Sequence, residues 1–180
     1  MLHLILPLLL AGGTDFLADE AGPHTTDGVM AGFGRLVGSW SCDSEFQPPQ
    51  GGDWQKSPQP ARWDFHFALD GAAVQDVWRP GVAGAPVGTN LRTYDPESDR
   101  WQMVWATATQ ARFDHFDATV IDGNIVMTGE RWARGALPAH HARITFHEIG
   151  EQSFEWRYEA SGTGAEGTFG EQSRISCRRL

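Results

Sequence analysis

The sequence predicts an all-β protein, an antiparallel up-and-down β-barrel of about ten strands with a short N-terminal helix or 3₁₀ segment as a plug. Eight tryptophans occur in 180 residues, most of them in short runs that alternate apolar and polar side chains. Turn-forming dipeptides such as Asp70-Gly71 and Asp122-Gly123 separate several of these runs. No helical pattern of roughly 10 to 15 residues lies between them, so the strands are expected to follow one another as hairpins. Such a meander removes its exposed edges by closing on itself.

The first elements are a plug and one strand. Gly28 to Val37 has a helical or 3₁₀ pattern, and we expect it to close one end of the barrel. Gly38 to Phe46 then alternates, which places Trp40 and Cys42 on one face. Residues 47–60 are rich in Pro, Gln and Gly, and they predict a long loop.

The rest of the chain is predicted to be consecutive hairpins, the last strand pairing with the first. A Pro-containing loop is expected to hold His140 and His141. The expected strands are Trp63 to Leu69, Ala72 to Arg79, Thr89 to Tyr94, Arg100 to Thr107, Phe113 to Ile121, Asn124 to Trp132, Ala142 to Ile149, Ser153 to Ala160 and Thr168 to Arg179.

The domain organisation is predicted to be simple. Residues 28–180 are expected to form one barrel domain, and residues 1–21 a signal peptide or a disordered leader. The leader contains an apolar run followed by small residues, but no Lys or Arg precedes the run, and the run is too short to span a bilayer. The alternatives are that the start of the chain is mis-assigned, or that the apolar segment is an arm that is not cleaved. We expect a periplasmic or extracellular protein if the signal is real, and a cytoplasmic protein otherwise.

The charge distribution argues against two classes of partner. The formal net charge is −9, and acidic and basic residues are interspersed. Nucleic acids and anionic membrane surfaces are bound by clustered positive charge. We therefore expect neither as a partner, and the sequence leaves the oligomeric state open.

The two cysteines lie near opposite ends of the predicted domain. If the first and last strands pair antiparallel, Cys42 and Cys177 become neighbours across the seam, and an exported protein would allow a disulfide between them. The alternative is two buried thiols that fill space. Neither cysteine has a surrounding pattern that indicates catalysis.

The candidate ligand-binding residues are aromatic and polar side chains that alternation directs inward. If Trp78 points inward, so does Asp76; if Tyr94 points inward, so does Arg92. An Asp76–Arg92 pair would be either a structural strut or the polar anchor of a ligand site. The candidate set is Trp40, Trp63, Asp76, Trp78, Arg92, Tyr94, Trp105, Glu130 and Trp156.

Two of these candidates carry further expectations. If Trp132 points inward, Glu130 does too and joins the polar groups of the site. The alternative is a glutamate that is exposed at the edge. Trp105→Ala is expected to cost about 3 to 5 kcal/mol if the indole is fully buried.

No cofactor or catalytic motif is predicted. The sequence has no Gly-x-Ser-x-Gly nucleophile elbow. A metal site from His115, Asp117 and His147 is one alternative, and solvent-facing polar residues are the expectation for these positions.

Four segments carry a resemblance to a known family. They are Leu36-Val37-Gly38-Ser39-Trp40, Leu69 to Trp78, Gly88 to Pro96, and Arg100-Trp101-x-x-x-Trp105. Together, over about residues 33 to 179, they resemble an uncharacterised bacterial family of lipocalin-like domains. The resemblance implies a calycin-type barrel that binds a small molecule. Ser41 and Cys42 stand where the nitrobindin-like version has further glycines, and this departure weakens an inference of haem binding.

Three functions follow as hypotheses. The first is a barrel that binds a small apolar or aromatic ligand between indole faces, with Arg92 and Asp76 orienting a polar end. The second is an enzyme that uses a buried carboxylate of the same cavity, Asp76 or Glu130. The third is a barrel filled by its own side chains, with a structural or interaction role.

Overall fold

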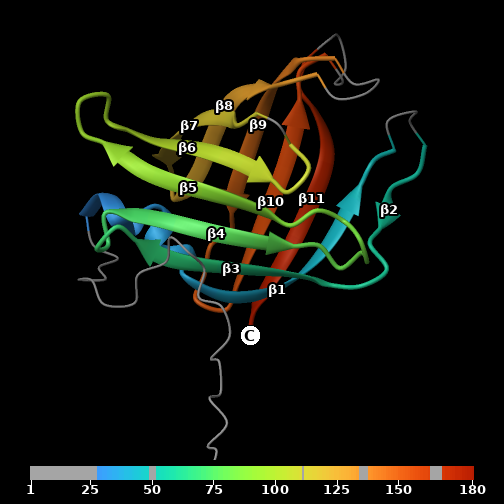
Figure 1. The fold of residues 1–180 in the computed structure, drawn as a ribbon, viewed down its shortest axis with the longest axis horizontal. Helices are drawn as coiled ribbons and strands as arrows, with labels where there is room; N and C mark the ends of the chain where they lie inside the picture. Colours follow the sequence, from blue (N-terminus) through green and yellow to red (C-terminus); the bar gives the residue numbers. More distant parts are fainter. Residues whose placement is uncertain (1–27, 49–51, 111, 134–137, 163–167) are drawn as a thin grey trace, which may run out of the picture.

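The computed structural model describes residues 28–48, 52–110, 112–133, 138–162 and 168–180, and it confirms a closed antiparallel β-barrel (Figure 1). The predicted leader, residues 1–21, lies outside the described residues. The strands are β1 (Gly38–Phe46), β2 (Gln55–Lys56), β3 (Ala61–Ala68), β4 (Ala73–Arg79), β5 (Gly88–Asp95), β6 (Arg100–Thr107), β7 (Asp114–Ile121), β8 (Asn124–Arg131), β9 (His140–His147), β10 (Ser153–Ala160) and β11 (Gly170–Arg179).

The barrel closes by the pairing of its first and last strands. The strand order in the sheet runs from β11 through β10 and β9 down to β3 and β1, so sequence neighbours are also spatial neighbours. β1 pairs antiparallel with β11 over seven residue pairs, from Trp40 opposite Arg179 to Phe46 opposite Ser173. A disulfide joins the cross-strand partners Cys42 and Cys177 in the middle of this seam.

Two segments differ from the sequence prediction. The loop expected over residues 47–60 contains a short strand, β2, which pairs with the end of β1 and lies outside the barrel. His140 and His141 belong to β9, because they pair with Arg131 and Glu130 of β8. The expectation of a loop at these histidines is wrong: pairing with β8 extends the strand further than its own residue pattern indicates.

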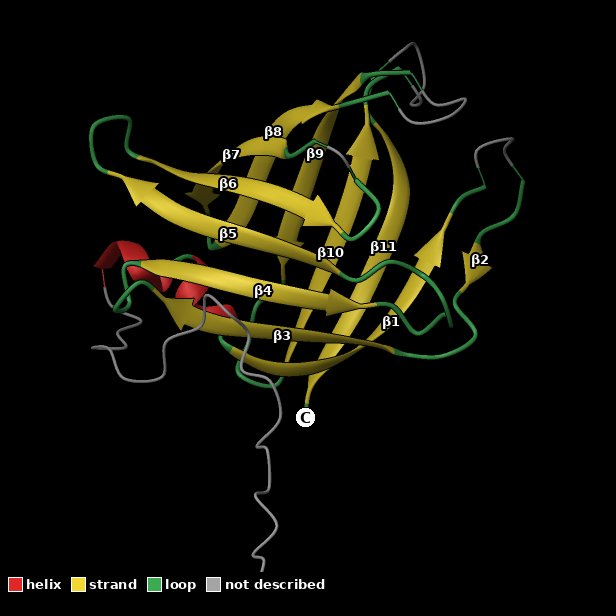
Figure 2. Ribbon diagram, in the orientation of Figure 1, coloured by secondary structure: helices red, strands yellow, loops and turns green. Residues whose placement is uncertain are grey.

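The predicted plug consists of two consecutive 3₁₀ turns, η1 (Gly28–Ala31) and η2 (Phe33–Leu36), at one end of the barrel (Figure 2). Phe33 and Leu36 are fully buried. The Phe33 ring packs edge-on against Trp101, with ring centroids 5.1 Å apart. The Trp40 indole N–H donates a hydrogen bond of 2.7 Å to the Leu36 carbonyl, which ties η2 to β1.

The interior of the barrel has two parts along its axis. Near the plug, Trp40, Phe65, Phe146 and Phe154 are almost completely buried and form a packed aromatic core. Towards the other end, inward-facing aromatic residues are only partly covered. This second part contains the candidate site.

Candidate ligand cavity

A cavity of about 580 Å³ opens at the end of the barrel away from the plug. It is lined by residues at the ends of β4, β6, β8 and β10, at the start of β9, and in the loop between β4 and β5. In an antiparallel meander these strand ends all meet at the same rim. The volume falls in the range of small-molecule sites, roughly 300 to 1,000 Å³.

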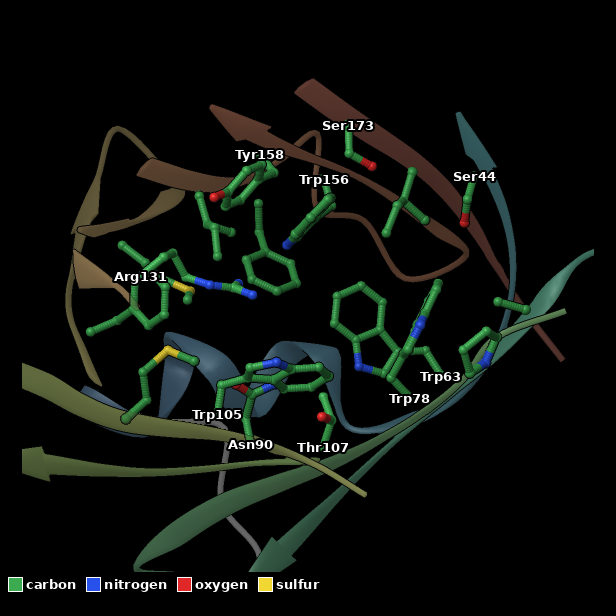
Figure 3. A pocket seen from close by; sticks show the side chains of 18 of the residues that line it. Ser44, Trp63, Trp78, Asn90, Trp105, Thr107, Arg131, Trp156, Tyr158 and Ser173 are labelled. Atoms are coloured by element: carbon green, nitrogen blue, oxygen red, sulfur yellow. The ribbon is translucent and has the colours of Figure 1, made fainter. Parts of the chain in front are cut away.

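Four indoles from different strands line the cavity (Figure 3). Trp63 of β3 contacts Trp78 of β4 edge-on, with ring centroids 4.9 Å apart. Trp156 of β10 lies 6.2 Å from Trp63 and stacks with Tyr158 at 6.4 Å. Trp105 of β6 completes the set. Indole faces at these positions can sandwich a flat apolar molecule.

The inner polar group of the cavity is a guanidinium. Arg92 lines the cavity from β5, and its side chain is only 1% exposed. Its Nη2 donates to the Asp76 carboxylate, and the Asn90 side-chain amide donates to both oxygens of the same carboxylate at 3.0 and 2.9 Å. Asp76 is completely buried and is not among the lining residues. The carboxylate therefore holds Arg92 in place instead of facing the cavity itself.

Two nitrogens of Arg92 have no hydrogen-bond partner among the residues that the structure describes, namely Nε and Nη1. The guanidinium carbon lies 4.8 Å from the ring centre of Phe33 and 5.5 Å from that of Phe65. These faces stabilise the cation without satisfying its N–H groups. The indole Nε1 of Trp63 is likewise buried without a partner in the described part of the chain.

The rim of the cavity carries a second polar group. Arg131 of β8 forms an ion pair of 2.9 Å with Asp114 of β7, whose side chain is fully buried. The Tyr158 hydroxyl and His140 Nε2 are 2.5 Å apart, and His140 Nδ1 lies 3.0 Å from the Pro138 carbonyl. Because a carbonyl oxygen can only accept a hydrogen bond, Nδ1 of His140 is the donor to Pro138.

Five of the nine candidate residues line the cavity. They are Trp63, Trp78, Arg92, Trp105 and Trp156. Trp40 is fully buried on the plug side and packs edge-on against Phe154, at 4.8 Å between ring centroids. It supports the core and does not reach the cavity.

Tyr94 faces inward but lies at the plug end, away from the cavity. It borders a separate hollow beside η1 and η2, together with Trp101 and Arg35. Its hydroxyl donates to the Asp99 carboxylate, and this hydrogen bond raises the tyrosine pKa. Tyr94 is therefore outside the lining of the candidate cavity, because alternation determines the face of a strand but not the position along the barrel axis.

Glu130 points outward, which is the second of the two alternatives for this residue. Its side chain is 78% exposed and lies 3.8 Å from His141 on the neighbouring strand. Ile125 and Met127 are the buried positions of β8, so alternation turns Arg131 inward and Glu130 outward. Trp132 lies beyond the end of β8 and reaches the cavity from the rim. Its position therefore does not show which side chains of β8 point inward.

The metal alternative has no support in the described ranges. No group of three or more His, Cys, Asp or Glu residues in them is arranged to hold a metal ion. His115 and Asp117 are both exposed on β7. His147 lies on β9, and β8 separates these two strands.

Eight polar residues of the described lining are outside the predicted set: Asn90, Arg131, His140 and Tyr158, and the hydroxyl residues Ser44, Ser57, Thr107 and Ser173. The first four form the hydrogen bonds and the ion pair described above. Alternation contains a signal for two of them, because Asn90 is two residues from Arg92 and Tyr158 is two residues from Trp156. Arg131 is not in the predicted set because Trp132 was expected to point inward, which turns its neighbour Arg131 outward. His140 was missed because it was placed in a loop.

Comparison of the chain with protein-family models and with curated proteins gives no match. In the part of the chain that the structure describes, no helix has the length and apolar character needed to cross a membrane.

Proposed function

We propose that this protein is a lipocalin-like binder of a small apolar or aromatic molecule, held in the barrel cavity between tryptophan rings. The observation that carries the proposal is the 580 Å³ cavity with five indoles in its lining, four from the strands and Trp132 from the rim. A barrel filled by its own side chains would lack this space. The absence of clustered positive charge in a chain of net charge −9 supports a small molecule over a nucleic acid as the partner.

The enzyme hypothesis loses the two carboxylates on which it depended. Asp76 is occupied by Asn90 and Arg92, and Glu130 faces solvent. Neither is positioned to exchange a proton with a molecule in the cavity.

We also propose that the protein works in an oxidising compartment, the periplasm or the extracellular space. The Cys42–Cys177 disulfide supports this location, because disulfides persist there and are rare in the cytosol. Comparing the mass of the mature protein from the periplasmic or culture fraction with that of the full chain tests it. A full-length protein found only in the cytosol contradicts it.

The binding proposal can be tested with one neutral dye and two glycine variants. A methyl group at Gly88 would lie 2.0 Å from Cη2 of Trp105, so Gly88→Ala must displace this indole, which lines the cavity. A methyl group at Gly150, in the hairpin between β9 and β10, makes only an ordinary contact of 3.6 Å with the Ser153 carbonyl. Gly150→Ala is therefore the matched control.

The dye is N-phenyl-1-naphthylamine, whose fluorescence rises in apolar surroundings. We expect saturable binding to the native protein, binding weakened about tenfold in Gly88→Ala, and no change in Gly150→Ala. Native mass spectrometry of the purified protein is expected to show a retained small molecule. Absence of dye binding, together with no retained molecule, would overturn the proposal, as would equal affinity in both variants.

A further inference from the structure

We propose that the cavity selects uncharged ligands that carry a hydrogen-bond acceptor, such as a ketone, quinone, ester or amide carbonyl, at their inner end, and that it disfavours carboxylates. This inference rests on the proposed binding function and adds the chemistry of the ligand. It follows from which hydrogen-bonding groups of the lining lack partners, and from how its charges are paired.

Among the described residues, three unpartnered nitrogens of the lining are donors, and one unpartnered oxygen, Ser44 Oγ, can donate or accept. Arg92 contributes Nε and Nη1, and Trp63 contributes Nε1, and none of them has a partner among the described residues. Both side chains are buried, at 1% and 5% exposure. A buried donor without an acceptor costs about 1 to 3 kcal/mol. None of these nitrogens is open to the cavity in this structure, so the Arg92 or Trp63 side chain must shift slightly before an acceptor on the ligand can bond it and remove this cost.

Each arginine of the lining already has its own carboxylate. Arg92 is paired with Asp76, and Arg131 with Asp114. Both carboxylates are completely buried, so neither is screened by water. These two arginines are the only Lys, Arg, Asp or Glu residues in the described lining of the cavity. The charges around the ligand therefore sum to about zero.

A neutral cavity of this kind treats anions and carbonyls differently. A carboxylate must leave water, and here it would find cations whose charge is already balanced at short range. A carbonyl oxygen has far less hydration to lose. It still accepts a charge-assisted hydrogen bond from either Nε–H or Nη1–H of the Arg92 guanidinium.

The experiment compares three probes with one ring system and different substituents. They are 2-acetylnaphthalene, with a ketone; 2-naphthoate, with a carboxylate; and 2-ethylnaphthalene, with no acceptor. Equilibrium dialysis against the full-length protein measures each affinity at neutral pH. We expect the ketone to bind at least about tenfold more tightly than either of the other probes.

Substitutions at Arg92 and Trp63 test whether these two side chains cause the preference for the ketone. Arg92→Met together with Asp76→Asn removes both charges at once and leaves the new amide next to Asn90, so no carboxylate is left buried without a partner. In this variant we expect the ketone and the ethyl compound to bind within about twofold of each other. Trp63→Phe keeps an aromatic ring but removes the N–H, and it should reduce the ketone preference by about threefold even if the double variant does not fold. Arg100→Gln, at an arginine 56% exposed on β6, is the control that leaves the preference unchanged.

The possible outcomes separate the inference from the function beneath it. Tightest binding of 2-naphthoate overturns the inference and leaves the binding function in place. Equal binding of all three probes also overturns it, because the donors would then be hydrogen-bonded to water and not to the ketone. If none of the three binds and the dye titration also fails, the proposed function itself is overturned.

Discussion

At the scale of single residues, tryptophans with the same predicted phase occupy different surroundings. Trp40 is completely buried and its indole N–H bonds to the plug, whereas Trp105 is half-buried because one side of its ring faces the cavity. The stability cost of removing a side chain follows the area it buries and the void it leaves. Inward orientation alone does not give that cost.

Replacing these two tryptophans should therefore have unequal effects. We expect Trp40→Ala to lower the free energy of unfolding by about 3 to 5 kcal/mol. Trp105→Ala should lower it by only about 1 to 2 kcal/mol, less than full burial would predict, because its removal enlarges an existing cavity. Urea unfolding of both variants provides the measurement. Equal losses would show that the cavity does not exist in solution.

Glu159 of β10 gives a pH-dependent contribution to stability. Arg143 donates two hydrogen bonds of 2.7 Å to this carboxylate, which lower its pKa against the opposing effect of burial, and Arg157 lowers it further. A carboxyl group with a lowered folded-state pKa stabilises the fold above its unfolded-state pKa, and this stabilisation is lost as the pH falls through the folded-state value.

The matching variant is Glu159→Gln. We expect it to be less stable than the native protein by about 1 kcal/mol at pH 7, and we expect the difference to shrink below about pH 4. Unfolding curves collected between pH 3 and 7 measure this. Glu148→Gln, at an exposed glutamate, serves as the control. A difference that stays constant with pH would contradict the role of the ion pair.

At the scale of elements, the seam between β1 and β11 joins the two ends of the folded chain. The Cys42–Cys177 disulfide links residues 135 positions apart and lies within seven consecutive residue pairs of that seam. A covalent link over a loop of this length restricts the unfolded chain strongly. It therefore complements the hydrogen bonds that close the barrel.

Removing the link should be costly but should preserve the fold. We expect Cys42→Ser with Cys177→Ser to lower the free energy of unfolding by about 4 to 5 kcal/mol, while the far-UV circular dichroism of the folded state is unchanged. Urea titration of the double variant beside the native protein gives the value. A loss below about 1 kcal/mol would mean that the unfolded chain is already restricted in another way.

The hairpins were predictable from sequence because their signals are local. Asp70-Gly71 and Asp122-Gly123 form turns in which Asp70 and Asp122 adopt positive φ angles of 54° and 50°. The flanking alternation then determines the strands. β2 and the start of β9 escaped prediction because their pairing partners, in β1 and β8, decide whether those residues become strand.

At the scale of the whole molecule, the closed sheet makes the plug, the aromatic core and the cavity parts of one structure. Every barrel strand pairs with two neighbours, so the described part of the barrel has no free edge at which it could open. Loss of the seam would remove the support of both ends of the sheet. This arrangement favours cooperative unfolding.

We accordingly expect one transition in urea for the disulfide-bonded protein. Tryptophan fluorescence reports the core and cavity indoles, and far-UV circular dichroism reports the strands. The two probes should give the same midpoint and slope. A fluorescence change that precedes the loss of strand signal would show that the cavity end unfolds independently of the plug end.

The sequence by itself determined the all-β class, the hairpin order and the set of inward tryptophans, because alternation and turn residues act over a few neighbouring positions. Only the tertiary structure decided that Arg131 and not Glu130 faces the cavity, that Tyr94 lies at the plug end, and that an open space remains between the indoles. These features depend on strand phase, on height along the barrel and on packing between residues far apart in the chain. Periodicity within one strand contains no information about height or about packing, and it gives the phase only when the buried positions of that strand are known.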